Sequence, residues 1–260
     1  MDHSKFVSTP MESNVKLTIR GSERSFMDIT LYRRLVGSLL YLTITRPDLS
    51  YCVGRLSQFM HDPSEEHWKL GKRVLRYISG TRDFGIIYKG SSSNLYAFSD
   101  SDFAGDQVDK KSINAFTIFI GDGAISWMSK KQETISLSST EAECKALTAC
   151  TKESLWIKRI LLELNLLVFQ RAPTLFCDNL SAQSLANNPV FHARSKHIEI
   201  AHHFVREQVM KKEVELQHVS SRECVADIFT KALAKDLFIK HRSDLGVISK
   251  SMLRLVEEGV

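Results

Sequence analysis

The stretch LYAFSDSDFAGD, residues 95–106, opens the part of the sequence that decides the fold. Its β-prone run over 95–99 predicts a strand, which Asp100 ends. A second strand is expected over 115–120, continued or followed by 124–128, because the GDG sequence at 121–123 favours a hairpin. We expect a third strand over 134–137, a fourth over 174–177 and a fifth over 214–219.

Helices alternate with the later strands. The segment SSTEAE, residues 138–143, offers Ser138, Ser139 or Thr140 as an N-cap and places two glutamates in the first turn. A long helix is therefore expected from this segment to about Leu164. Shorter helices are expected over 181–186, 198–210 and 225–233. The resulting order of strands and helices is that of a mixed α/β layer fold.

The chain before Gly80 has a helical pattern instead. Residues 1–25 are polar without a sustained period and are expected to form an extended lead-in. Apolar residues recur every three or four positions over 28–42, which predicts an amphipathic helix. Pro47 suits the start of a second helix, expected to run to about Met60. Asp62, followed by Pro63 and Glu65, predicts a capped third helix that Gly80 ends.

Composition bounds the class of protein but not its function. The chain has 260 residues, of which 43% are hydrophobic, enough for a real core. Its net charge of +5 is compatible with a phosphate-backbone partner. The five cysteines form no CxxC pair, so a reducing compartment is expected rather than a disulfide framework or zinc site. No apolar stretch has the length of a signal peptide or membrane span, so we expect an intracellular protein without a membrane partner.

Four acidic residues fall where the predicted elements change. Asp100 and Asp178 each end a predicted strand, Glu143 lies in the first turn of the long helix, and Asp227 opens the last helix. Such junctions are where α/β folds gather ligands, and a carboxylate cluster suits a hard divalent cation such as Mg²⁺. Taken singly, Asp100 and Asp178 suit a turn or a helix cap better than a catalytic role, because aspartate favours the ends of elements. Asp102 and Asp106 compete with the first aspartate, and Glu141 with the glutamate.

Longer motifs make the pattern specific. YAFSDSDFAGD (96–106), GDGAISWMSKKQETISLSSTEAE (121–143), LFCDNLSAQSLANNPVFHARSKHIEI (175–200) and VADIFTKAL (225–233) follow one another in the chain. In this order they resemble the ribonuclease H domain at the C-terminal end of the Pol polyprotein of copia-type LTR retrotransposons. The preceding LYRRLVGSLLYLTITRPDLSYCVGRLSQFM (31–60) resembles the reverse transcriptase thumb and connection of the same polyprotein. The resemblance covers nearly the whole chain.

The resemblance implies a fold and an activity. The fold would be a ribonuclease H-like five-stranded mixed sheet flanked by helices and preceded by a small helical unit. The implied boundaries are an extended lead-in over 1–25, a thumb/connection-like segment over 26–88, a ribonuclease H-like domain over 89–240 and a tail over 241–260. The implied activity is hydrolysis of the RNA strand of RNA/DNA hybrids with two Mg²⁺ ions, for which Mn²⁺ is an expected substitute, and no small-molecule cofactor. The catalytic and metal-binding residues would be Asp100, Glu143, Asp178 and Asp227.

Other residues are candidates for contact with the hybrid. A basic face is expected from Arg194, Lys196, His197 and Arg206, with a solvated helix face as the equal alternative, and Asn179 of the CDN motif joins this set. The spacing of the nearby histidines does not favour zinc. Trp127 and Trp156 lie in apolar runs and are expected in the core rather than as base-stacking residues.

Two other functions are weighed. A catalytically silent retroelement fragment would keep nucleic-acid binding but no longer cut. A reverse transcriptase is disfavoured because the sequence contains no Asp-Asp pair, whereas the family's polymerase palm carries a Tyr-x-Asp-Asp motif. The palm and fingers of the same polyprotein are therefore expected partners supplied from outside this chain.

Overall fold

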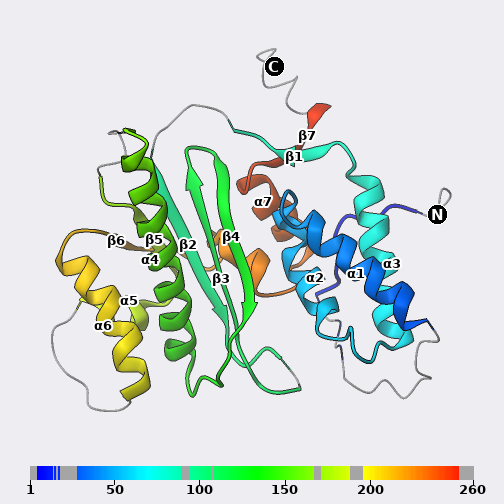
Figure 1. Cartoon of the computed structure of the whole chain (residues 1–260), viewed down its shortest axis with the longest axis horizontal. Coiled ribbons are helices and arrows are strands. Elements are labelled where there is room, and N and C mark those ends of the chain that lie inside the picture. The colour runs from blue at the N-terminus through cyan, green and yellow to red at the C-terminus, as the bar shows by residue number, and fades with distance from the viewer. Residues whose placement is uncertain are drawn as a thin grey trace. The chain divides into compact units, whose positions relative to one another are not determined.

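A computed structural model describes residues 5–13, 15, 17, 28–88, 94–106, 108–166, 171–187 and 196–251, without the side chains of 187 and 196–202. The described chain separates into two compact units, Tyr88–Thr230 and a second that combines Met1–Ile87 with Lys231–Val260. Figure 1 traces both units along the chain. None of the described helices is both long and apolar enough to cross a membrane.

A five-stranded sheet forms the centre of the Tyr88–Thr230 unit. Its strands lie in the order β4-β3-β2-β5-β6. β2, β3 and β4 pair antiparallel, and β5 and β6 continue the sheet parallel to β2, so the sheet is mixed. The bounds are β2 Leu95–Asp102, β3 Ile113–Ile120, β4 Gly123–Lys131, β5 Thr174–Cys177 and β6 Glu215–His218. This sheet confirms the predicted ribonuclease H-like fold class.

Three helices cover one face of this sheet (Figure 1): α4 (Ser139–Glu163), α5 (Leu180–Asn187) and α6 (Lys196–Met210). The long α4 packs on β2 and β3 and also contacts α6. The core between helices and sheet contains Ala97, Ile118 and Leu175 from the strands, packed with Leu147 and Cys150 of α4. Side chains alternate along a strand, so Asp100, three residues after Ala97, points to the opposite face.

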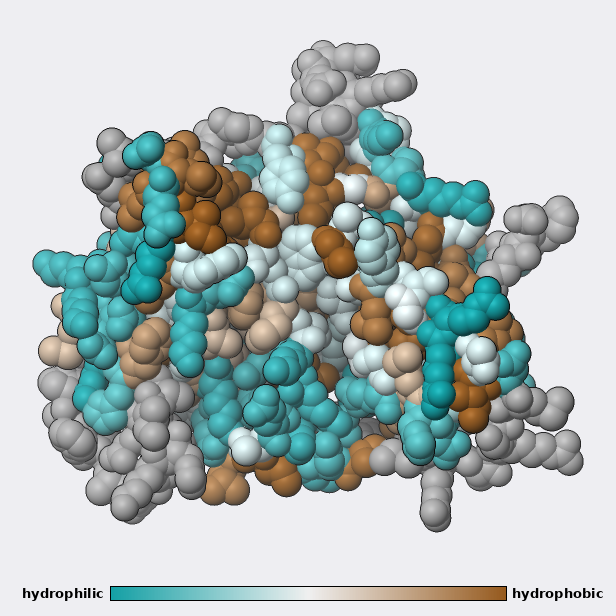
Figure 2. All heavy atoms as spheres, viewed as in Figure 1, coloured by the Kyte–Doolittle hydropathy of each residue, from teal (hydrophilic) through white to brown (hydrophobic). Residues whose placement is uncertain are grey.

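The surface of α4 corrects one prediction. Figure 2 shows hydrophobic side chains gathered over the C-terminal end of α4, where Leu164 is 65% and Leu166 43% exposed. Trp156, expected in the core, is 57% exposed, so that expectation is wrong. Its helix face turns away from the sheet, whereas neighbouring Leu155 and Ile157 are buried. Trp127 is half-buried on β4.

The strand expected over 134–137 is absent. β4 continues instead to Lys131, and the following residues lead into the N-cap of α4, Ser138. Local side chains occupy the groups that a strand would use: the Leu137 N–H donates to the Glu141 carboxylate at 2.8 Å, and the Ser136 hydroxyl donates to Gln132 Oε1 at 2.6 Å. The sheet keeps five strands because β4 is a strand of its own.

The predicted closing helix over 225–233 is also shorter than expected. Only Val225–Phe229 is helical, as the 3₁₀ helix η3, which packs on β2 and β3. The Ser129 hydroxyl of β4 donates to the Phe229 carbonyl at 2.5 Å. The Thr230 hydroxyl bonds the Asp100 carboxylate and the Asp227 carbonyl, which fixes the chain where the helix ends.

The second unit contains the N-terminal helices. Its elements up to residue 87 are α1 Ile29–Leu42, η1 Pro47–Leu49, α2 Ser50–Ser57, α3 Glu65–Gly80 and β1 Phe84–Ile86. The expected second helix is thus a 3₁₀ turn followed by α2. The cap of α3 is Ser64, not Asp62, because the Ser64 hydroxyl accepts from the His67 N–H and the His67 ring accepts from the Ser64 N–H.

The second unit also contains the end of the chain. Helix α7 (Lys235–Asp244) crosses the boundary expected at residue 240, and strand β7 (Val247–Ser249) lies in the region expected as a tail. β7 pairs antiparallel with β1. Arg242 of α7 donates to the Tyr77 hydroxyl at 3.3 Å, and Tyr77 donates to Asp48 at 2.6 Å. The boundary expected at residue 240 therefore differs from the end of the compact sheet unit at Thr230.

Candidate active site

Parallel pairing of β2 with β5 brings two aspartates together. Ser99 is the register partner of Cys177, the last residue of β5. The next residues are Asp100, which is still within β2, and Asp178, which directly follows β5, so they lie side by side on adjacent chain segments about 4.8 Å apart. Asp100 is buried and Asp178 is half-buried.

Glu143 joins this pair from the start of α4. Its Oε1 accepts a hydrogen bond from the Ser101 backbone N–H at 3.4 Å, so the glutamate lies against the end of β2. One ligand atom each from Glu143, Cys177 and Asp178 lie within 4.8 Å of one another. Only 5% of Glu143 is exposed.

Asp227 lies on η3, which packs on β2 and β3. The Thr230 hydroxyl joins it to β2, since this one group donates to the Asp100 carboxylate and lies 3.2 Å from the Asp227 carbonyl. Asp227 and Asp100 are each 3% exposed. Thr230 was not among the site residues expected from the sequence.

The pKa values of two buried thiols are raised by the negative charge of this region. Burial raises the pKa of Cys177, and the charges of Glu143, Asp178 and Asp100 raise it further. Burial also raises the pKa of Cys224, again with Asp100, Asp227 and Asp178 adding to the effect. The Cys224 Sγ lies 3.6 Å from the Ser99 carbonyl of β2. Each of the four acidic residues therefore raises the pKa of at least one of these thiols.

The competing acidic residues have other partners. The Asp106 carboxylate lies 2.7 Å from the Lys131 ammonium and accepts from the Val108 N–H at 2.8 Å. Glu141 accepts from the Leu137 N–H and lies 2.8 Å from the Lys145 ammonium. Asp102 is the last residue of β2, two positions beyond Asp100. These contacts assign Asp106 to a loop and Glu141 to a helix start.

The expected nucleic-acid contacts are only partly described. The Asn179 side-chain oxygen accepts from the Ala182 N–H at 2.9 Å and so caps α5. Arg206 is half-buried on α6, with a guanidinium nitrogen 2.7 Å from His203 Nδ1. Arg194 lies outside the described residues, as do the side chains of Lys196 and His197. The Ser221 hydroxyl donates to Asp178 Oδ2 at 2.6 Å, and Ser221 was not among the residues expected from the sequence.

The donor set fits divalent cations with a preference for oxygen. Three of the acidic residues are almost fully buried, and like charges at close range in such a place repel strongly. A hard cation offsets that repulsion, and carboxylate oxygens are the ligands that Mg²⁺ and Mn²⁺ prefer. Asp100, Glu143, Asp178 and Asp227 are the residues that would hold it.

Comparison with known proteins gives strong relatives in sequence. The chain is 45% identical over 246 residues, 94% of its length, to "Retrovirus-related Pol polyprotein from transposon RE2" of Arabidopsis thaliana. It is 38% identical over 244 residues, 92% of its length, to "Retrovirus-related Pol polyprotein from transposon TNT 1-94" of Nicotiana tabacum. The chain spans only 17% and 18% of these two relatives. No family model matches.

Solved structures are more distant. A ribonuclease H1 from Halobacterium salinarum is 14% identical, with a TM-score of 0.39, and the match covers 53% of this chain and 94% of that one. A ribonuclease H1 isolated from compost is 11% identical, with a TM-score of 0.42, over 57% of this chain and 97% of that one.

Proposed function

Because the chain belongs to the Pol polyproteins of copia-type LTR retrotransposons, we propose that its Tyr88–Thr230 unit is a ribonuclease H that hydrolyses the RNA strand of RNA/DNA hybrids. The observation that supports this most is that carboxylate oxygens of Glu143 on α4 and Asp178 after β5 lie within 4.8 Å of each other. Glu143 also accepts a hydrogen bond from Ser101, the neighbour of Asp100 on β2, and Thr230 connects Asp100 to η3, which carries Asp227. The sequence motifs predict each of these four residues.

The proposed mechanism assigns a task to each protein group. Asp100, Glu143, Asp178 and Asp227 would hold two Mg²⁺ ions, which would supply charge stabilisation for an in-line attack of water on a phosphodiester. Thr230 orients the Asp100 carboxylate, and Ser221 orients that of Asp178. Such hydrogen bonds to ligating carboxylates fix the ligands before the metal arrives. The products would carry a 3′-hydroxyl and a 5′-phosphate.

The substrate class follows from the same family membership. Selectivity for the RNA strand would come from its 2′-hydroxyl and from the shape of the hybrid, not from base sequence. Arg206 and Asn179, with Arg194, Lys196 and His197, are the residues we propose for contact with the hybrid backbone. The polymerase palm and fingers of the same polyprotein would be supplied by residues outside this chain.

A cleavage assay tests the proposal. The full chain is incubated with Mg²⁺ and a hybrid labelled separately on each strand, beside Asp178→Asn and Asp122→Asn. Asp122 is an exposed aspartate in the β3–β4 turn, so its substitution removes the same charge away from the site. We expect cleavage of the RNA strand alone by the parent and by Asp122→Asn, and none by Asp178→Asn.

Other outcomes would contradict the proposal. Equal cleavage by the parent and Asp178→Asn would indicate a contaminating nuclease. Binding of the hybrid by a folded parent chain without any cleavage would favour the catalytically silent fragment instead.

Replacing Mg²⁺ with Mn²⁺ is expected to preserve activity. Replacing Mg²⁺ with Ca²⁺ is expected to abolish activity, because Ca²⁺ takes a larger and more flexible ligand shell.

A further inference from the structure

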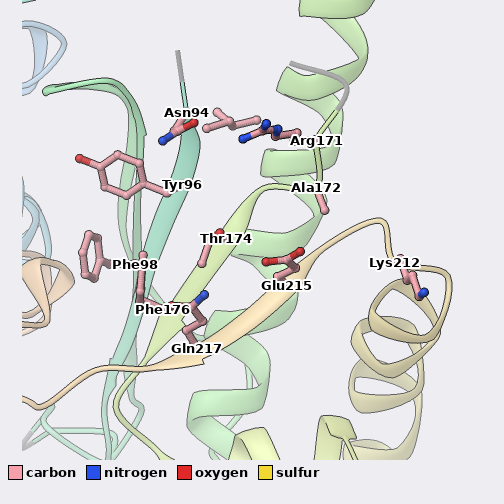
Figure 3. A pocket seen from close by; sticks show the side chains of 11 residues that line it. Asn94, Tyr96, Phe98, Arg171, Ala172, Thr174, Phe176, Lys212, Glu215 and Gln217 are labelled. Atoms are coloured by element: carbon pink, nitrogen blue, oxygen red, sulfur yellow. The ribbon is translucent and has the colours of Figure 1, made fainter. Parts of the chain in front are cut away.

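A cavity of about 770 Å³ lies over strands β2, β5 and β6. Three of its lining aromatic residues, Tyr96, Phe98 and Phe176, are half-buried, and we call them the aromatic platform. The sheet register aligns Phe98 with Phe176 and Gln217, and Tyr96 with Thr174. In Figure 3 the rings of Tyr96 and Phe98 project to the same side of β2.

The platform is held rigid by its own packing. The Phe98 and Phe176 rings are stacked, with centroids 4.9 Å apart and planes 22° apart. The Tyr96 ring stacks on buried Phe119 at 4.9 Å, and its hydroxyl donates to the Gly121 carbonyl at 2.9 Å. Rings fixed in this way lose little entropy when a flat ligand stacks on them.

The rim of the cavity carries groups suited to nucleotides. Arg171 and Asn94 lie at the end of the sheet where β5 and β2 begin (Figure 3). The Arg171 guanidinium is exposed and suits a phosphate, whereas Asn94 and Gln217 can donate to and accept from base edges. Glu215 also lines the cavity; it would repel a phosphate but can accept from a base amino group.

The platform continues towards the carboxylates on one sheet face. One face of β2 carries every second residue: Tyr96, Phe98 and Asp100. The same face of β5 carries Thr174 and Phe176, and Asp178 follows two residues later. Residues two apart on a strand are separated by about 6.7 Å. A ligand stacked on Phe98 therefore lies about 6.7 Å along the strand from Asp100. Because Asp100 is a residue of the proposed nuclease site, this position favours nucleic acid over a protein segment as the ligand.

We propose that the aromatic platform binds unpaired nucleotides of a single strand, with bases stacked on Phe98 and Phe176 and a phosphate on Arg171. Its role in the enzyme rests on the proposed nuclease function: it would hold a single-stranded extension of the hybrid beside the site of cleavage. The binding itself does not require catalysis. Stacking on aromatic rings accepts every base, so we expect little sequence preference.

Fluorescence anisotropy of the full chain with a labelled oligothymidylate of about 12 nucleotides tests this binding. EDTA is present throughout, so that cleavage contributes nothing. Phe176→Leu keeps an apolar side chain but removes the ring, and it is expected to weaken binding on the order of tenfold. Arg171→Gln is expected to weaken binding and reduce its dependence on salt. Phe204→Leu, on α6, is the matched control and should bind as the parent does.

The ligand is varied as well as the protein. An abasic oligonucleotide of the same length keeps the phosphates and removes the bases, and it is expected to bind at least tenfold more weakly. Equal binding of the abasic strand, or an unchanged Kd in both Phe176→Leu and Phe98→Leu, would overturn the proposal. Loss of self-association in these two variants, without any effect on oligonucleotide binding, would also overturn it and assign the surface to a second copy of the chain.

Circular dichroism checks that each variant is folded, and the exposed Arg171→Gln variant keeps the test decisive if a ring substitution unfolds the chain.

The two proposals can fail separately. Ring-dependent binding by a parent chain that cannot cut a hybrid would keep the platform and reject the nuclease. Cleavage of blunt hybrid without any ring-dependent binding of single strands would do the reverse.

Discussion

At the scale of single residues, Thr230 links two of the candidate ligands. Its hydroxyl donates to the Asp100 carboxylate and lies 3.2 Å from the Asp227 carbonyl. The four acidic residues could be named from motifs because their types and order are distinctive. Thr230 and Ser221 could not, because a hydroxyl next to an acidic residue is common and only the fold shows which carboxylate it meets.

Replacing Thr230 with valine keeps its shape and removes the hydroxyl. We expect about 10- to 100-fold lower hybrid cleavage or a similar rise in the Mg²⁺ concentration needed, because the ligating carboxylate loses its orienting partner. Thr230→Ser should restore most of the activity. Thr117→Val is the control, since the buried Thr117 hydroxyl has no hydrogen-bond partner among the described residues. Unchanged metal dependence in Thr230→Val would remove its positioning role.

The buried thiols predict an alkaline loss of stability. Burial raises the pKa of Cys150 from 9.0 to about 12. The folded state therefore keeps a proton that the unfolded chain loses, so this contribution is complete below pH 9 and is lost as pH rises towards 12. Each such proton changes stability by about 1.4 kcal/mol per pH unit in that window. Denaturant unfolding at pH 8 and pH 10 should show a smaller alkaline loss in Cys150→Ala than in the parent.

At the scale of elements, Gln132 joins β4 to the start of α4. Its side-chain nitrogen lies 2.5 Å from Asn114 Oδ1, 3.3 Å from the Ala142 carbonyl and 3.4 Å from the Ser101 hydroxyl. Ser101 and Ala142, the sequence neighbours of Asp100 and Glu143, thus both lie within hydrogen-bonding distance of the Gln132 amide nitrogen. This network explains why 132–138 is not a strand, which the alternation of apolar and polar residues could not show.

Removing this amide should affect both stability and the site. Gln132→Met keeps the volume but leaves buried acceptors unsatisfied, so we expect a loss of about 1–3 kcal/mol in the free energy of unfolding. Weaker Mg²⁺ binding should accompany it, because the backbone of Ala142 carries the next residue, Glu143. Denaturant unfolding and Mn²⁺ binding followed by electron paramagnetic resonance measure the two effects. Gln58→Met, at an exposed position, should change neither.

At the scale of the whole molecule, the sequence predicted a five-stranded mixed sheet and the order of most elements. It did not predict where the second unit resumes. Helix α7 has few apolar residues, and only Phe238 and His241 of it are buried, so its pattern resembles a solvated tail. Its membership in the second unit depends on pairing between residues far apart in sequence, such as Phe84 with Ser249.

The pairing of β1 with β7 has a consequence for synthesis on the ribosome. The sheet unit is complete once Thr230 has emerged, whereas β1, made earlier, has no partner until Val247–Ser249 is translated. Domains generally fold as units while the chain grows. The Tyr88–Thr230 unit should thus become protease-resistant before the second unit, although the second unit begins earlier in the chain. Limited proteolysis of stalled nascent chains would detect this order.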